Sequence, residues 1–193
     1  MSNRINIFDR KERSRSELIK ASKNFYYEMW MLSESFRMMS NIRCENNAVP
    51  PDKQSLNNAL LEDFLVHARG ILDFFYARDV TQEDDVIAED FFDNNISWRN
   101  IRKSENVEKT LWLEKVHPRV GKEIAHLTYV RQNITPEEKN WNPAQIYCDI
   151  WRVLQVFLVK VGKEKLHESI DRLRENNQKI DIIPVHKIKN KSE

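Results

Sequence analysis

The sequence predicts an all-α fold, a four- to five-helix up-and-down bundle, on three observations. Apolar residues recur every three or four positions through long segments, which is the period of an amphipathic helix. The 193 residues include only three glycines, too few for the turns of an all-β fold or for a glycine-rich phosphate loop. No linker or internal repeat divides the chain, so we expect one domain over 1–178 and a basic, flexible tail over 179–193.

We expect the first helix over 14–42 and the second from a cap at Asp52 or Ser55 to about Arg78. The first helix carries an unbroken heptad seam with one polar position, Ser22, which indicates packing against another helix in the core or, alternatively, a dimer seam. The apolar seam positions are Leu18, Phe25, Met29, Leu32, Phe36 and Met39. The second helix has one apolar face, formed by Leu56, Leu60, Phe64, His67, Ala68, Ile71 and Phe75.

The later elements are predicted from capping residues and prolines. We expect a short third helix over 82–92, a loop over 93–103 in which Trp98 plugs the bundle, and a fourth helix capped by Ser104. Pro118 predicts a kink or break near His117, after which a helix would begin at Pro118 or Arg119 with a positively polarised end. The last long helix is expected to begin at Pro143 and to run to about 164, or as far as 176. Its cap is Asn142 with Gln145, and its seam is Ile146, Tyr147, Ile150, Leu154, Phe157, Leu158 and Val161.

Composition excludes several function classes. The net charge of +1 indicates no global attraction to nucleic acid or anionic lipid. The charged segment 1–15 lacks the apolar core of an export signal, no apolar stretch could span a bilayer, and Cys44 and Cys148 show no CxxC spacing. We therefore expect a cytoplasmic protein with reduced thiols, no membrane association and no cofactor.

Arg119 and His126 form the strongest candidate for chemistry. Seven residues on an α-helix make almost two turns, so both side chains are expected on one face. Arginine binds a phosphodiester in bidentate fashion, and histidine can transfer a proton near neutral pH. The pair would suit metal-independent RNA cleavage, in which the 2′-hydroxyl attacks. Lys122 and Arg131 are candidate RNA-binding residues.

This arrangement resembles the HEPN superfamily of prokaryotic helical domains, whose motif is an Arg, four to six residues, and a His on a late helix. The segments 58–75 and 124–131 are most similar to the abortive-infection U-type branch and its uncharacterised bacterial relatives. The resemblance implies a homodimer with two motifs meeting at the interface, and a ribonuclease of a toxin–antitoxin or phage-defence system with an antitoxin or other protein partner. Val120 stands where the motif usually has Asn, Asp or His.

His67 and Arg69 add a second polar group on the second helix. His67 lies on the apolar face, where an imidazole needs a partner; we expect a hydrogen-bonded histidine that bridges helices, or alternatively a residue that supports His126 in one polar pocket. Arg69 and Asp73 are four apart and are expected to pair.

Two other functions stay open from the sequence. One is a non-catalytic helical interaction or dimerisation protein, in which Arg119 is a surface residue and His126 packs at the bundle edge. The other is a di-metal carboxylate bundle, because Glu123–His126 and Glu164–His167 both match Glu-x-x-His. We expect no metal ligands, because the second of these motifs lies in a run of charged residues.

Overall fold

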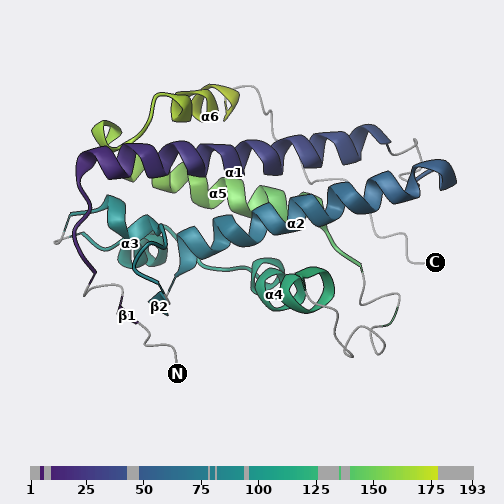
Figure 1. Ribbon diagram of the computed structural model, residues 1–193, viewed down its shortest axis with the longest axis horizontal. Coiled ribbons are helices and arrows are strands. Elements are labelled where there is room, and N and C mark those ends of the chain that lie inside the picture. Colours follow the sequence, from purple (N-terminus) through teal and green to yellow (C-terminus); the bar gives the residue numbers. More distant parts are fainter. Residues whose placement is uncertain are drawn as a thin grey trace.

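The computed structural model describes residues 5–6, 10–42, 48–77, 79–80, 82–93, 96–125, 135 and 140–177. This part of the chain is an all-α helical bundle, which confirms the predicted fold class (Figure 1). Its α-helices are α1 (Arg15–Ile42), α2 (Gln54–Tyr76), α3 (Trp98–Ser104), α4 (Leu111–Val120), α5 (Pro143–Lys160) and α6 (Ser169–Asn177). The short elements are the 3₁₀-helices η2 (Pro51–Lys53), η3 (Ala88–Phe91) and η6 (Lys163–Lys165), the π-helix η4 (Gly121–Ala125), and the antiparallel strand pair β1 (Ile5–Asn6) and β2 (Asp79–Val80).

The long helices α1 and α2 lie side by side and form the largest helix–helix contact (Figure 1). Helix α1 begins at a capping box: the Ser14 backbone N–H donates to Glu17 Oε2 at 2.8 Å, and the Glu17 N–H donates to Ser14 Oγ at 3.3 Å. The predicted heptad seam is confirmed, because its apolar positions and Ser22 are buried or partly buried. The seam therefore packs into the core of the same chain.

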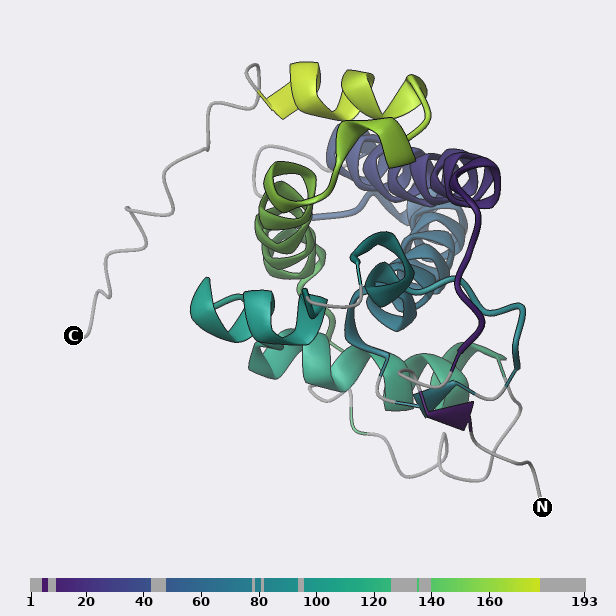
Figure 2. The same ribbon diagram turned by 90° about the vertical axis from the view of Figure 1, so that its left-hand side faces the viewer.

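Helix α5 supplies the centre of the aromatic core. Asn142 Oδ1 accepts the Gln145 N–H at 3.1 Å, which confirms the predicted cap. Phe157 is 1% exposed. Its ring centroid lies 5.4–6.3 Å from those of Phe25, Phe74, Phe75, Phe91, Phe92 and Trp98. One side chain thus joins α1, α2, η3, α3 and α5, the elements that surround the core in Figure 2.

Helix α2 begins differently from the prediction. Its capping position is Lys53, which makes no side-chain cap bond, so neither Asp52 nor Ser55 caps it. The 3₁₀-turn Pro51–Lys53 leads into the helix instead, because proline suits the first turn, where its missing N–H costs nothing. Leu56 is 46% exposed, so the predicted apolar face begins one turn later.

The predicted helix over 82–92 is wrong, because η3 is its only helical part in the structure. The guanidinium groups of Arg10 and Arg13 donate hydrogen bonds to the backbone carbonyl of Glu83, and Arg10 also bonds the carbonyl of Asp85. These carbonyls are therefore engaged by side chains from the N-terminal segment rather than by helical N–H groups.

Trp98 plugs the core as predicted, but it stands at the start of α3 rather than in a loop. It is 2% exposed, and Nε1 donates to the Phe75 carbonyl at 2.9 Å. Ser104 ends α3 and does not cap α4, because Asn106 has a φ of 53° and closes α3 in the left-handed conformation. Thr110 caps α4 instead, accepting the Leu113 N–H at 3.3 Å.

Helix α4 continues through Pro118 to Val120, so the break expected near His117 is absent. The irregularity falls after the proline, where Gly121–Ala125 adopt π-helical geometry. Arg119 consequently lies in the last turn of a helix, and the prediction that it begins one is wrong.

The chain does not continue helically from α5 to 176. Helix α5 ends at Lys160, and α6 packs against α1 as a separate element (Figures 1 and 2). Buried Ser22 holds the turn before α6, because its Oγ accepts the His167 backbone N–H at 2.8 Å. The polar position in the α1 seam thus docks α6.

Three predictions concern the rest of the chain. The tail 179–193 and Cys44 lie outside the described residues, and Cys148 is an exposed free thiol. No helix in the described ranges combines the length and the apolar character needed to cross a membrane.

Candidate functional site

Glu123, Asn140 and Trp141 hold the Arg119 side chain in place. Its Nε and Nη2 lie 2.6 and 2.9 Å from the two carboxylate oxygens of Glu123, and Nη1 donates to the Asn140 carbonyl at 3.3 Å. The guanidinium carbon lies 3.7 Å from the ring centroid of Trp141. The Arg119 and Glu123 side chains are only 17% and 15% exposed. The Nε/Nη2 edge of the guanidinium, one of the two that can bind a phosphate in bidentate fashion, is therefore occupied by a carboxylate.

The surroundings of Arg119 also differ from those expected of a phosphate site. Arg119 lies where α4 passes directly into the π-helix Gly121–Ala125, so it is not at a helix N-terminus, the end whose free N–H groups and partial positive charge favour a phosphate. The prediction that Arg119 and His126 share one face assumed α-helical geometry between them. Gly121–Ala125 form a π-helix instead, which has more residues per turn, so that argument from spacing does not apply. Lys122 is exposed on this π-helix. His126 and Arg131 lie outside the described residues.

His67 bridges α1 and α2, as predicted for a hydrogen-bonded histidine. Nδ1 lies 2.7 Å from Glu28 Oε2, and Nε2 lies 3.5 Å from Asp63 Oδ1. Asp63 also accepts a hydrogen bond from Ser35 of α1. The hydrogen bond with Glu28 stabilises the protonated imidazole and raises the pKa of His67.

This raised pKa predicts a pH-dependent contribution to stability. The folded-state pKa lies above the unfolded one, so the contribution is complete below about pH 6.5 and is lost as the pH rises through the folded-state value. We expect His67→Gln to lower the free energy of unfolding by about 1 kcal/mol at about pH 5.5 and by less at about pH 8.5. Urea denaturation of the wild type and the variant at about pH 5.5 and about pH 8.5 measures the free energy of unfolding. Glu28→Gln should flatten the pH dependence in the same way; a wild-type slope in both variants contradicts the assignment.

Asp73 links α2 to α4 through a pair that the sequence did not reveal. The predicted Arg69–Asp73 pair is present with Nε 3.9 Å from Oδ2, and His117 Nε2 lies 3.3 Å from Asp73 Oδ1. Burial raises the pKa of Asp73, against the opposing charges of His117 and Arg69. A Cβ atom on Gly121 would lie 3.8 Å from Arg69 Nη1. Arg69 therefore reaches the start of η4, near the predicted motif, whereas His67 faces α1.

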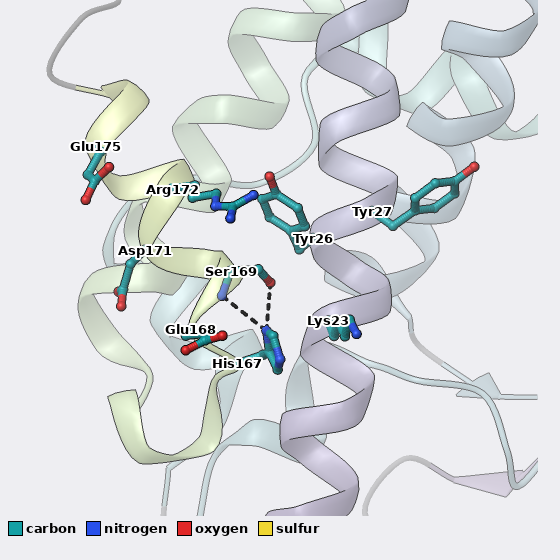
Figure 3. A pocket seen from close by; sticks show the side chains of 9 residues that line it. All are labelled: Lys23, Tyr26, Tyr27, His167, Glu168, Ser169, Asp171, Arg172 and Glu175. Atoms are coloured by element: carbon teal, nitrogen blue, oxygen red, sulfur yellow. Dashed lines mark hydrogen bonds between the residues drawn. The ribbon is translucent and has the colours of Figure 1, made fainter.

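A cavity of about 710 Å³ lies between α1 and α6 (Figure 3). Its lining carries Lys23 and Arg172 together with three carboxylates, and Asp171 and Glu175 point away from Tyr26. His167 Nδ1 accepts the Ser169 backbone N–H at 3.1 Å, which places the imidazole in the turn that begins α6. The charged side chains of the lining do not converge on one point, and His167 is hydrogen-bonded to Ser169 in its own turn. This cavity therefore indicates no particular reaction.

The described residues give no support to a di-metal centre. Within them, no group of three or more His, Cys, Asp and Glu side chains could hold a metal ion. Glu123 of the first predicted Glu-x-x-His motif pairs with Arg119 instead.

Comparison with known proteins places the chain beside none of them. No protein-family model matches it, and no curated protein or solved structure does so either. Its fold defines the class: an all-α helical bundle, in which the pairs His67–Glu28 and His117–Asp73 link α1 to α2 and α2 to α4.

Proposed function

We propose that this protein is a homodimeric helical bundle that works as an interaction module rather than through phosphate binding by Arg119 and proton transfer by His126. The observation that carries the proposal is a stripe on α1 formed by exposed Lys23, Tyr27 and Trp30 and by half-buried Glu34, which also pairs with Arg37 at 2.6 Å. Tyr27 and Trp30 are 51% and 45% exposed, and their ring centroids lie 6.1 Å apart. Two adjacent aromatic side chains left in water are typical of a protein–protein contact.

The stripe is complementary to itself. Its residues are spaced by four, three and four positions, so they share one face of the helix. If two copies of α1 pack antiparallel about a two-fold axis between Glu28 and Met29, Lys23 meets Glu34 of the second copy and Tyr27 meets Trp30. Such reciprocal contacts are what a two-fold interface requires. Figure 3 shows the Tyr27 ring pointing from α1 away from α6, while Tyr27 and Lys23 also contribute to the lining of the α1–α6 cavity.

Sedimentation velocity at micromolar concentration tests the proposal. We expect a species of twice the 23.1 kDa chain mass. Lys23→Glu and Glu34→Lys should each weaken the dimer about tenfold by placing like charges opposite one another, and the double variant should restore it. A monomer at every concentration contradicts the proposal, and a double variant no better than the singles contradicts the antiparallel register.

A metal-independent endoribonuclease of the HEPN type is the second proposal, and the π-helix after Arg119 supports it. Single π-turns are rare in proteins, and those that occur are often found at functional sites. In this mechanism Arg119, with Lys122 and Arg131, binds the RNA phosphates, and His126 transfers the proton as the 2′-hydroxyl attacks. Glu123 must release Arg119 before a phosphate binds. A toxin–antitoxin or phage-defence role, with an antitoxin as partner, belongs to this proposal.

Cleavage assays separate the two proposals. The wild type, His126→Ala and Glu123→Gln are incubated with single-stranded RNA and with tRNA in EDTA. A ribonuclease loses cleavage with His126→Ala and gains it with Glu123→Gln, because Arg119 is then no longer neutralised. No cleavage, or cleavage that persists in His126→Ala and so comes from a contaminant, contradicts this second proposal and leaves the dimer unaffected.

A further inference from the structure

A second, smaller cavity lies where the end of α2 meets α3 and the segment before α4. It encloses about 210 Å³ and is lined by four cationic side chains, Arg99, Arg102, Lys103 and Lys109. Glu108 and Glu114 contribute two carboxylates, which leaves an excess of two positive charges. Neither proposed function uses this cavity.

The local fold explains why the cations converge. Arg99, Arg102 and Lys103 are three and four positions apart on α3, so they share a face, while Trp98 anchors the helix in the core. After α3 the chain reverses at Asn106, where the Val107 N–H bonds the Arg102 carbonyl at 2.9 Å. Tyr76 then holds this reversal, because its hydroxyl donates to the Val107 carbonyl at 2.9 Å. The reversal brings Lys109 to the same cavity.

Arg102 is the unusual member of this group. The residue is 6% exposed, and its guanidinium carbon lies 4.5 Å from the Tyr76 ring centroid. Its ion pair is long, with Nη1 3.6 Å from Glu108 Oε1, and the Glu108 side chain is half exposed. Nε is buried and has no hydrogen-bond partner in the described part of the chain. A buried guanidinium stays charged and is costly without a strong partner. The protein therefore maintains a buried cation that its own carboxylates compensate poorly.

We propose that this cavity binds the phosphoryl group of a phosphate monoester, with Arg102 inside and Arg99 and Lys103 at the rim. The excess of two positive charges matches the charge of roughly −2 on a monoester at neutral pH better than the single charge of a carboxylate. The volume is below the roughly 300 Å³ at which pockets begin to take drug-sized ligands. It admits the phosphoryl group and a small attached group, and a larger molecule would leave its remainder outside. Glu108 competes with the phosphoryl group for Arg102.

Titration calorimetry of the full chain at constant ionic strength tests this site. The probes are inorganic phosphate, ribose 5-phosphate, and a uridine hexanucleotide with and without a 5′-phosphate. We expect binding that weakens at least about tenfold in the double variant Arg99→Gln with Lys103→Gln. Both residues are exposed, so the variant should fold. Glu108→Gln should strengthen binding several-fold, and exposed Lys20→Gln on α1 is the matched control for a lost positive charge.

The probes distinguish the source of the phosphoryl group. Binding of ribose 5-phosphate supports the site with a small monoester as ligand, and binding of the 5′-phosphorylated hexanucleotide alone supports it with a polynucleotide end. Equal binding of both hexanucleotides overturns the proposal, because the terminal phosphate is then not recognised. Absence of binding by every probe at millimolar concentration, or equal losses in the rim variant and Lys20→Gln, also overturns it. None of these outcomes bears on the dimer.

Discussion

Phe157→Ala is expected to lower the free energy of unfolding by about 3–5 kcal/mol, as for other large aromatic side chains removed from a core. The Phe157 ring touches aromatic side chains of α1, α2, η3 and α3. Its removal therefore opens a cavity shared by most of the bundle, which the fixed backbones around it cannot fill. The loss is a large part of the roughly 5–15 kcal/mol that stabilises a typical domain.

Urea denaturation followed by circular dichroism measures this change. Val159→Ala is the matched control, because Val159 lies on the same helix and is 79% exposed; it should change stability by less than about 0.5 kcal/mol. A loss of under about 1 kcal/mol in Phe157→Ala would mean that the aromatic cluster is not the centre of the core.

Trp30→Asp is expected to weaken the proposed dimer by about 30-fold or more, the loss typical of an aromatic residue central to an interface. The substitution would place a carboxylate opposite Tyr27 of the second copy, in a contact that excludes water. The isolated chain should lose little, because Trp30 is 45% exposed. The variant therefore separates association from folding.

Sedimentation equilibrium measures the dissociation constant, and thermal denaturation at low concentration checks that the variant is folded. Leu111→Asp is the control: it introduces the same charge at a residue that is 76% exposed, in the first turn of α4, where an acidic side chain is tolerated. If both variants keep the wild-type constant, the α1 stripe is not the interface.

The helices α1 and α5 show which features could be predicted from local sequence. Their seams and the Asn142 cap follow from spacing and capping within the element, and all were confirmed. The prediction over 82–92 used the same local signals and was wrong. The hydrogen bonds that decide that segment come from Arg10 and Arg13, far away in the chain.

The candidate sites divide in the same way. Spacing correctly paired Arg69 with Asp73, and it gave His67 a place between two helices. It could not supply the contact of Trp141 with Arg119, the pairing of His117 with Asp73, or the gathering of cations around Arg102. Each of these contacts joins residues from separate elements. The spacing of residues within one element therefore cannot predict it.

The sequence by itself determined that the chain forms amphipathic helices and which faces they bury, because helical periodicity is a local property of the residues. Only the tertiary structure decided the partners of the polar side chains: Glu123 and Trp141 around Arg119, Glu28 beside His67, and the backbone of α6 on Ser22. The physical reason is that burying apolar area requires only a matching face, whereas a charge or hydrogen-bonding group needs a particular atom within about 3 Å, which packing alone brings there.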